Sequence, residues 1–287
     1  MNHASLFAEH RSTMVGAAYR VLGSLHDAED VVQDVWPRWE AVDLDAVRAP
    51  RAYLVQAATR QALNRLREQQ RRREEYVGPW LPEPVGDVTR LGGEADIETA
   101  ESVSMAMLVV LAALSPLERA AFVLKEVFDV PYAEIAETLD RSESAVRQLA
   151  HRARSHVHAR APRHAVDAAA HRKVTQAFLA AVQGGSLEDL LVHLSPDVVL
   201  ITDGGGLKKA ALRPVHGVEK VLRFGLGVLA KPDMPTQWRA VEVNGLPGIA
   251  GFFEDGTLDS VTTFYLDGPL VRELYMVRNP EKLRQLL

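Results

Sequence analysis

Hydrophobic positions recur with two different periods along the chain, and the change of period divides it into a helical part and a strand-rich part. Up to about residue 160, apolar residues return every three or four positions, which is the spacing of amphipathic helices. Beyond it, short β-branched and aromatic runs are separated by Asn244-Gly245, Asp255-Gly256 and Asp267-Gly268, pairs that favour hairpin turns. The pattern predicts all-α domains followed by an α+β domain with a mostly antiparallel sheet.

Capping and turn residues set the limits of the expected elements. Ser115 to Glu118 form a capping box with a proline in the first turn, Asp27 can cap a helix after Gly23, and Pro50 suits a first helical turn. We expect helices over residues 6–22, 27–40, 50–73, 98–114, 116–127, 132–139, 143–157, 165–182 and 218–229. We expect strands over residues 197–203, 237–243, 248–255, 257–267 and 270–278.

Charge is arranged in blocks of opposite sign. Residues 27–45 carry seven acids against one arginine, residues 48–73 carry eight arginines against one glutamate, and residues 74–101 carry eight acids against one arginine. The net charge of −5 argues by itself against a nucleic-acid partner, because phosphate neutralisation requires Lys and Arg. The blocks instead predict different electrostatic partners for different segments.

Composition excludes several classes of protein. The chain has no cysteine, which rules out disulfides, thiolate metal sites and thiol nucleophiles. It has neither an apolar run of the ~18 residues that a membrane span needs nor an N-terminal secretory pattern. We therefore expect a cytoplasmic protein without a membrane segment.

Residues 132–157 have the pattern of a helix-turn-helix. A short helix ending at Leu139 is joined by the tight turn at residues 140–142 to a second helix, with small residues where the two cross. DNA reading needs short polar and basic side chains on the first turns of the second helix. The candidates are Glu143, Ser144, Arg147, Gln148, His151, Arg152 and Arg154. The alternative is an ordinary helical hairpin with a basic outer face.

The two charged helices before it each allow two interpretations. The arginine-rich helix is either a solvated face or a second DNA-binding element, and the acidic helix is either solvated or docks on a basic protein surface. Trp36, Trp39 and Tyr53 either stack on unpaired bases or fill the core, and we expect core for some of them. A helix-turn-helix, a separate basic helix and a separate acidic helix together predict an adaptor between a large enzyme and DNA.

In this order the segments resemble the bacterial extracytoplasmic-function (ECF) sigma factors, the RNA polymerase subunits that recognise promoters. DAEDVVQDVWPRW is similar to region 2.2, PRAYLVQAATRQALNRLRE to regions 2.3 and 2.4, and LSPLERAAFVLKEVFDVPYAEIAETLDRSESAVRQLAHRAR to region 4. The resemblance implies that region 2.2 docks on the clamp helices of the polymerase largest subunit through Glu29, Asp30, Gln33, Asp34 and Trp36. It implies that the −10 element is engaged by Arg48, Arg51, Tyr53, Arg60, Asn64, Arg65 and Arg67, and the −35 element by the helix-turn-helix candidates.

Three further stretches resemble the sigma-factor group that carries a SnoaL-like C-terminal extension. They are WLPEP at residues 80–84, DGGG at 203–206 and NPEKL at 279–283. The group's usual motif has a lysine directly after the third glycine, whereas Leu207 precedes Lys208 and Lys209 here. The resemblance implies a built-in regulator that replaces a separate anti-sigma protein. The implied contact residues are Trp80, Leu81, Pro82, Asp203, Gly204, Gly205, Gly206, Asn279 and Pro280.

The expected organisation is multidomain. Two all-α domains, at residues 1–75 and 98–162, are joined by a proline-bearing linker at 76–97 and followed by an α+β SnoaL-like cone at 163–287. The partners implied are core RNA polymerase and promoter DNA, with no cofactor or metal and with a monomeric free protein. A one-component helix-turn-helix regulator with a ligand-sensing cone is the competing interpretation.

The cone also allows catalysis or ligand sensing. Candidate acids and bases are Asp203, His193, His216, Asp259 and Tyr265, but no carboxylate and histidine stand at a diagnostic spacing, so we expect no enzyme activity. The aromatic residues Phe252, Phe253, Phe264 and Tyr265 either line a ligand pocket or fill the core, the latter being expected more often.

The stretch TDGGGLKKA at residues 202–210 lacks the glycine spacing of a phosphate-binding loop. Asp203 has no partner identifiable from the sequence, which counts against a catalytic turn. Two interpretations remain: a tight structural turn, or a contact surface for the sigma domains or their linker.

Overall fold

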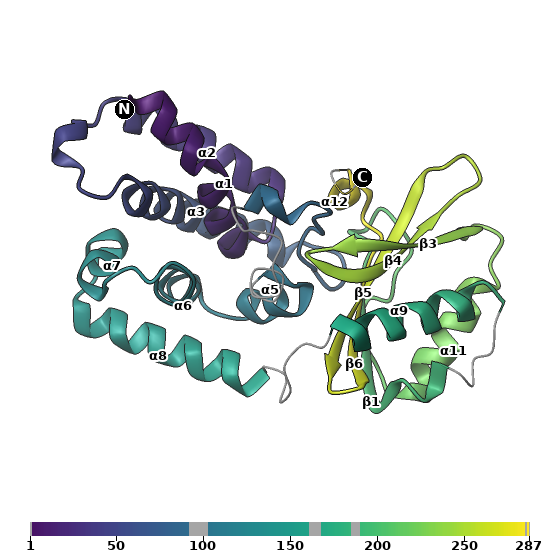
Figure 1. Cartoon of the computed structure of the whole chain (residues 1–287). Helices are drawn as coiled ribbons and strands as arrows, with labels where there is room; N and C mark the ends of the chain where they lie inside the picture. Colours follow the sequence, from purple (N-terminus) through teal and green to yellow (C-terminus); the bar gives the residue numbers. More distant parts are fainter. Residues whose placement is uncertain (1, 92–102, 161–167, 185–189, 285, 287) are drawn as a thin grey trace. The chain divides into compact units, whose positions relative to one another are not determined.

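The computed structural model describes residues 2–91, 103–160, 168–184, 190–284 and 286 (Figure 1). The chain forms two compact units. The helical unit comprises Met1–Glu74, Val88–Val103 and Met107–Ala161, and the C-terminal unit comprises Glu75–Asp87, Ser104–Ala106 and Pro162–Leu287. The expected domain limits near 97 and 162 lie outside the described residues. None of the helices in the described residues has the length and apolar character that crossing a membrane requires.

The helical unit begins with three long helices, which lie together in Figure 1. They are α1 (His3–Leu22), α2 (Leu25–Glu40) and α3 (Pro50–Glu74), with the short turn η1 (Leu44–Ala46) between the last two. The remaining elements are η2 (Val88–Leu91), α5 (Met105–Ala112), α6 (Pro116–Phe122), the π-helical turn η3 (Val123–Val127), α7 (Tyr132–Leu139) and α8 (Glu143–Arg160). Helix α5 is shorter than the helix expected over 98–114, whose first residues lie outside the description.

Local capping explains most of these limits. The expected capping box is confirmed at α6, where the Ser115 hydroxyl accepts from the Glu118 N–H and the Glu118 carboxylate accepts from the Ser115 N–H. The expectation for α2 was wrong. Gly23 ends α1 in the left-handed conformation, and the Ser24 hydroxyl caps α2 by accepting from the Asp27 N–H at 3.2 Å. Asp27 is thereby one turn inside the helix, and its carboxylate is free for another contact.

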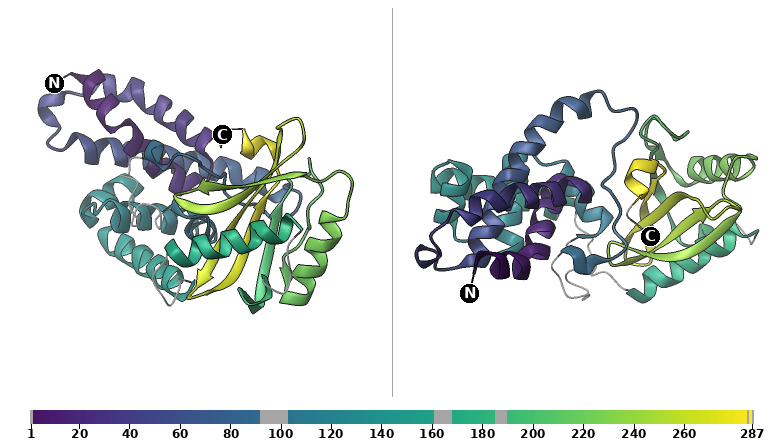
Figure 2. Two further views of the ribbon diagram at one scale, coloured as in Figure 1. Left: turned by 45° about the vertical axis from the view of Figure 1, so that its right-hand side comes forward. Right: turned by 90° about the horizontal axis from the view of Figure 1, so that it is seen from above.

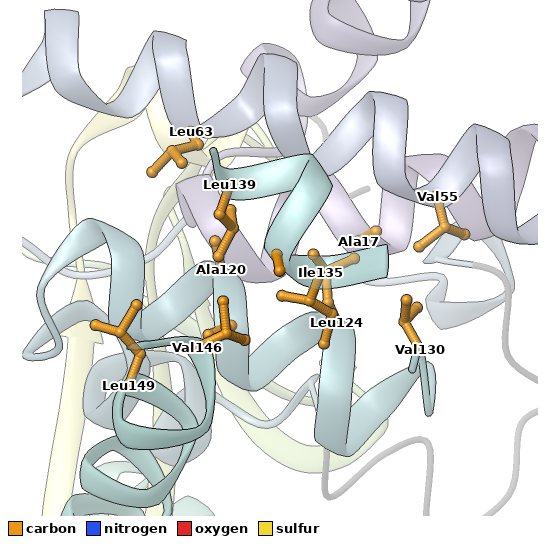
Figure 3. Packing of buried hydrophobic residues seen from close by; sticks show 12 residues of the cluster. Ala17, Val55, Leu63, Ala120, Leu124, Val130, Ile135, Leu139, Val146 and Leu149 are labelled. Carbon is orange, nitrogen blue, oxygen red and sulfur yellow. The ribbon is translucent and has the colours of Figure 1, made fainter. Parts of the chain in front are cut away.

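One hydrophobic cluster joins helices from both expected all-α domains (Figure 3). Ala17 of α1 and Val55 and Leu63 of α3 pack with residues of α6, η3, α7 and α8. The latter are Ala120, Ala121, Leu124, Ile135, Ala136, Leu139, Val146 and Leu149, joined by Val130 from the loop between η3 and α7. A second cluster, including Leu111, Phe122 and Val157, holds α5, α6 and α8 together. The first and second helical segments therefore share a core within one unit.

The C-terminal unit is a six-stranded mixed sheet with helices on one face (Figure 2). The strands are β1 (Leu194–Asp203), β2 (Val215–His216), β3 (Gln237–Val243), β4 (Leu246–Phe252), β5 (Leu258–Asp267) and β6 (Leu270–Val277), in the order β2-β1-β6-β5-β4-β3. Helices α9 (Ala168–Val182) and α11 (Val218–Leu229) bury apolar side chains such as Val174 and Val221 against Leu200, Phe264 and Leu274. A final short helix, α12 (Pro280–Leu283), follows β6.

The expected strands, the helix over 218–229 and the three hairpin turns are confirmed. Asn244 and Gly245 both have positive φ, 53° and 77°, as a two-residue hairpin turn requires. Two features were not expected. Strand β1 pairs with β6 in parallel, and His216, expected in a loop, lies in the short strand β2 beside Val199.

Residues 75–87 pack within the C-terminal unit, although residues 76–87 were expected as the first part of a linker and residue 75 as the end of the first helical domain. The Val85 N–H donates to the Asn244 side-chain oxygen at 3.2 Å, and the Asn244 N–H donates to the Val85 carbonyl at 2.7 Å. The backbone of Gly86 lies close to that of Leu286. An extended segment thus forms one edge of this unit.

Candidate functional site

Helix α8 presents one polar face to solvent. The Ser142 hydroxyl accepts from the Ala145 N–H at 3.3 Å, and the apolar side of the helix, including Val146 and Leu149, is buried. This orientation leaves six of the seven −35 candidates exposed, namely Glu143, Ser144, Arg147, Gln148, His151 and Arg152, with Arg154 half-buried. Four of them, Arg147, Gln148, His151 and Arg152, line a shallow depression of about 300 Å³.

Three arginines of this face pair with glutamates of the helical unit. The pairs are Arg147–Glu143, Arg152–Glu118 (Nε to Oε1, 2.8 Å) and Arg154–Glu126 (Nη2 to Oε1, 2.7 Å). Exposed pairs of this kind contribute only ~0–1 kcal/mol, so phosphate can replace the glutamates at little cost. Hydrogen bonds to Glu126 and Tyr132 raise the pKa of Arg154, which therefore stays positively charged.

Helix α3 carries most of its −10 candidates on one exposed stripe. Tyr53, Arg60, Asn64 and Arg67 are seven, four and three residues apart, a spacing that places them on the same helical face, and all four are exposed. The opposite face, with Leu54, Ala58 and Leu66, is buried. Arg48 and Arg51 are exposed at the start of the helix, where the Arg51 guanidinium lies 5.9 Å from the centre of the Phe128 ring.

Arg65 differs from the other −10 candidates because it is engaged by α2. Its Nη2 lies 2.8 Å from Asp27 Oδ1 and 3.0 Å from Asp30 Oδ2, and its Nε also donates to Asp27. Burial alone would raise the pKa of Asp27, but hydrogen bonds from Arg65 and Ser24 outweigh it and hold that pKa below its ordinary value. Arg65 thus fastens α3 to α2.

The polymerase candidates lie along α2. Gln33 and Asp34 are exposed, whereas Glu29, Asp30 and Trp36 are half-buried. Trp36 meets the Phe7 ring edge-on at 5.0 Å between centroids. The acidic face therefore remains accessible in part.

The aromatic residues near these helices divide between core and surface. Trp39 is fully buried and its Nε1–H donates to the His3 carbonyl at 2.9 Å, which confirms that one of the three fills the core. Tyr53 keeps 39% of its surface exposed. Among the three, Tyr53 is the residue best placed to stack on an unpaired base.

In the C-terminal unit, the three group motifs converge on the buried carboxylate of Asp203, at the end of β1. Its Oδ1 accepts from the Tyr76 hydroxyl at 2.6 Å and from the Gly205 N–H at 3.0 Å. Its Oδ2 accepts from the Leu81 N–H at 2.8 Å and from the Lys282 ammonium at 2.7 Å. The partner of Asp203 that sequence reasoning did not identify is therefore Lys282, supported by Tyr76. We call Tyr76, Trp80, Leu81, Asp203, Asn279 and Lys282 the linker network.

The Lys282 ammonium is enclosed by this network. It donates to the Leu81 carbonyl at 2.5 Å and lies 4.3 Å from the Trp80 ring and 5.0 Å from the Tyr76 ring, in cation–π contact. The Asn279 amide donates to the Tyr76 hydroxyl at 2.9 Å. Burial and the hydrogen bond to Asp203 raise the pKa of Tyr76, so its phenol stays protonated and can donate.

Most of the expected regulatory residues therefore meet. Trp80, Leu81, Asp203, Gly205 and Asn279 are in mutual contact through the linker network. Gly204 is buried in the same loop, Pro82 follows Leu81 in the extended segment, and Gly206 and Pro280 are exposed at its edge.

A second ion pair supports the loop after Asp203. Arg278 binds the fully buried carboxylate of Asp259 through Nε and Nη2, both at 3.0 Å, and donates to the Lys209 carbonyl at 2.7 Å. Lys208 reaches the same carboxylate at 3.2 Å. Leu207, the residue that precedes the lysines, is 59% exposed.

These contacts bear on the catalytic candidates. The carboxylates of Asp203 and Asp259 are both bound by basic side chains, which makes them poor general bases. His216 is exposed in β2. Within the described part of the chain, no three His, Asp or Glu side chains converge as a metal site would require.

Sequence reasoning missed several residues of the linker network and its surroundings. Lys282 lies within the quoted NPEKL motif, which was a usable signal, whereas nothing in the sequence indicated that Arg278 binds Asp259. The contacts of Tyr76 with Asp203 and of Asn244 with Val85 gave no signal, because these partners lie 127 and 159 residues apart in the chain.

Models of two protein families match the chain. The description "Sigma-70 region 2" matches residues 6–72, and "Sigma-70, region 4" matches residues 104–157. These ranges contain α1 to α3 and the helices through the helix-turn-helix, in the expected order.

Relatives extend the match over almost the whole chain. An ECF RNA polymerase sigma factor of Mycobacterium tuberculosis, SigJ, is 38% identical over 97% of this chain and 92% of its own length. A probable ECF sigma factor of the same species, SigI, is 34% identical over 96% and 93%. The crystal structure of SigJ superposes with a TM-score of 0.79 and covers 99% of both chains. The chain therefore belongs to the ECF RNA polymerase sigma factors, with the fold of sigma regions 2 and 4 followed by a helix and mixed-sheet domain.

Proposed function

We propose that this protein directs core RNA polymerase to specific promoters, and that its C-terminal unit regulates this activity. The observation that carries the proposal is the separation of charge in the helical unit. One exposed basic stripe lies on α3 and another on α8, while α2 keeps Asp34 exposed and Glu29 and Asp30 half-buried. Two basic faces suit two promoter elements, and one acidic face suits a basic surface of the polymerase.

In this proposal, α8 reads the −35 element through its first turns and the α3 stripe engages the −10 element. Gln33 and Asp34 contact the polymerase with the other polymerase candidates of α2. The chain catalyses no reaction, since the polymerase supplies the chemistry. Because it acts on RNA polymerase, we propose that it works in the cytoplasm, and that the free protein is a monomer.

The regulatory part rests on the linker network. Residues 76–81 begin the connection from α3 to the helices that follow. Asp203 and Lys282 of the linker network hold the backbone and side chains of these residues. A held linker limits how far the −10 and −35 binding helices can separate. Ligand sensing has less support, because Phe264 is buried and packs on Phe178 at 4.7 Å within the core.

The decisive experiment is run-off transcription with core polymerase and the full-length protein on a promoter library. We expect promoter-specific transcripts that depend on the protein. Arg147→Ala should lower them by roughly tenfold, since a good base contact contributes ~1–3 kcal/mol. Arg223→Ala, which removes an exposed arginine of α11, is the matched control and should leave the transcripts unchanged. Tight duplex binding without any association with core polymerase would instead support the one-component regulator.

Regulation is tested by Lys282→Met, which keeps the aliphatic stem and removes the charge from Asp203. We expect this variant to change transcript yield by a measurable factor in the same assay, while the helical signal of the protein persists. Lys220→Met, at an exposed position of α11, is the control. If Lys282→Met releases residues 76–81 and still gives the same transcript yield as the parent protein, regulation through the linker network is contradicted.

A further inference from the structure

The short segment η2, immediately after the linker network, is docked on α1. Val88 and Leu91 are 3% and 2% exposed, and η2 packs along α1 within the helical unit. The Leu91 carbonyl lies directly over Gly16, so that a methyl group at position 16 would come within 1.9 Å of the oxygen and 2.8 Å of the carbonyl carbon. Only a glycine permits this approach.

Gly16 is otherwise hard to explain. It lies in the interior of a 20-residue helix, where glycine is less favourable than alanine because it loses more backbone freedom on folding. The φ of Gly16 is not in the left-handed region, so the helix itself does not require glycine there. The close contact with the Leu91 backbone is the feature that does.

A second contact fixes η2 on α2. The Arg90 guanidinium lies 2.6 Å from Glu29 Oε1, and pairing leaves the Glu29 side chain 21% exposed. Glu29 is the first polymerase candidate of α2. A basic polymerase surface that binds α2 would compete with Arg90 for this carboxylate, because one carboxylate cannot give its full charge to both.

We propose that residues 88–91 are an internal competitor for polymerase, docked on a surface formed by Gly16 of α1 and Glu29 of α2. We call this segment the linker latch. The inference rests on the proposed docking of α2 on polymerase and adds to it the residues of this chain that occupy the same surface. Polymerase then binds only molecules in which the latch is open, and the measured affinity falls by the open fraction.

The latch is covalently continuous with the segment that the linker network holds. The segment that Asp203 and Lys282 hold continues through Gly86 and Asp87 directly into η2. Release of residues 76–81 from Asp203 and Lys282 would let the chain move that must shift when residues 88–91 leave α1 and α2. Opening of the latch and rearrangement of the linker are therefore expected to accompany each other.

The test compares four full-length variants with the parent protein. Gly16→Ala expels the Leu91 carbonyl but improves the helix propensity of α1, and Arg90→Gln removes the ion pair while leaving the helix unchanged. Gly227→Ala is the control, because it makes the same substitution in helix α11 where nothing lies within 4 Å of the added methyl group. Glu29→Gln removes the shared carboxylate.

Two readouts are needed. Hydrogen exchange at residues 88–91 reports latch opening, and titration of a fluorescently labelled protein with core polymerase reports affinity. We expect faster exchange and roughly two- to tenfold tighter polymerase binding for Gly16→Ala and Arg90→Gln, no change for Gly227→Ala, and weaker binding for Glu29→Gln.

The outcomes separate the two proposals. Faster exchange without tighter binding, or unchanged exchange in both latch variants, would each overturn the latch while leaving polymerase docking intact. Unaltered affinity in Glu29→Gln would show that polymerase does not use this carboxylate, and would overturn docking through Glu29 together with the latch. Failure of the parent protein to bind core polymerase would overturn the proposed function and the latch with it. If Gly16→Ala melts below the parent protein, Arg90→Gln decides the question.

Discussion

The glycine triplet after Asp203 has a local explanation. The Asp203 carboxylate accepts from the N–H of Gly205, which folds the loop back at once, and Gly205 adopts a φ of 59°. A side chain at position 205 would come within 2.3 Å of Asn279 Nδ2. The structural turn and the contact surface considered from the sequence are thus the same feature, because the turn creates the contact.

Replacing Asp203 by asparagine should destabilise the C-terminal unit. The Lys282 ammonium would lose its counter-charge in a site where its side chain is 13% exposed, and breaking such a pair from one side costs about 3 kcal/mol or more. Urea unfolding of the full chain measures the loss. Asp233→Asn, at an exposed position of the same unit, should change stability little, and an equally small change in Asp203→Asn would show that the linker network adds no stability.

At the scale of elements, α2 and α3 are connected by charge as well as by packing. The acids on α2 and the bases on α3, which form separate blocks in the sequence, meet at Asp27, Asp30 and Arg65. Arg51, Arg60 and Arg67 of α3 are exposed to solvent. The helix proposed to engage DNA is therefore oriented by the helix proposed to engage polymerase.

The ion pair between Asp27 and Arg65 predicts that the unfolding free energy depends on pH. Because the pKa of Asp27 is held below its unfolded value of ~3.9, its contribution to stability is complete above that pH and is lost as the pH falls through the lower, folded-state pKa. Asp27→Asn should lower the unfolding free energy by roughly 1 kcal/mol at pH 7. Urea unfolding followed by helical circular dichroism at several pH values measures both.

The two stability curves, of the parent protein and Asp27→Asn, should converge once the pH falls below the lowered, folded-state pKa of Asp27. Asp45→Asn, at an exposed position, serves as the control and should follow the parent protein at every pH. Parallel curves for Asp27→Asn would mean that the carboxylate is not stabilised by Arg65 in the folded state.

At the scale of the whole helical unit, the shared core limits how far apart α3 and α8 can lie. Promoter elements named −35 and −10 are centred about 25 base pairs apart, or roughly 85 Å at 3.4 Å per base pair. A compact unit of this kind has a radius of gyration of roughly 15 Å. We therefore expect α3 and α8 to separate when both elements are bound, which exposes the core cluster around Leu124 and Ile135.

Polar contacts at the edge of that core offer a test of separation. Gln56 donates to Glu134 at 2.7 Å, so Gln56→Glu would place two carboxylates together and favour the open form. Since the chain has no cysteine, dyes attached through Ala41→Cys and His158→Cys can report the distance by fluorescence transfer. Transfer should fall in Gln56→Glu and persist in Gln237→Glu, whereas equal transfer in both would argue against opening at this edge.

Local signals predicted the elements well. The limits of α7 and α11 and of strand β3 agree with those expected, because apolar spacing, a capping box and two-residue turns act over a few residues. The exposed faces of α3 and α8 also followed from periodicity, whereas the order of the sigma-like segments followed from the family resemblance. The expectation that Asp27 caps α2 failed, since Ser24 also suits the position and directly follows Gly23, which ends α1.

Contacts between distant segments could not be predicted in this way. Asn279 and Tyr76 meet across 203 residues, β1 pairs in parallel with the last strand, and the Leu91 carbonyl rests on Gly16. None of these leaves a periodic trace, because each depends on where the folded chain brings a single residue. The amino-acid pattern therefore sufficed for the long helices, the longer strands and their exposed charges, but not for the short elements β2 and α12. The partners of Asp203, Arg65 and Glu29 depend on packing, since an ion pair forms wherever folding places opposite charges within reach.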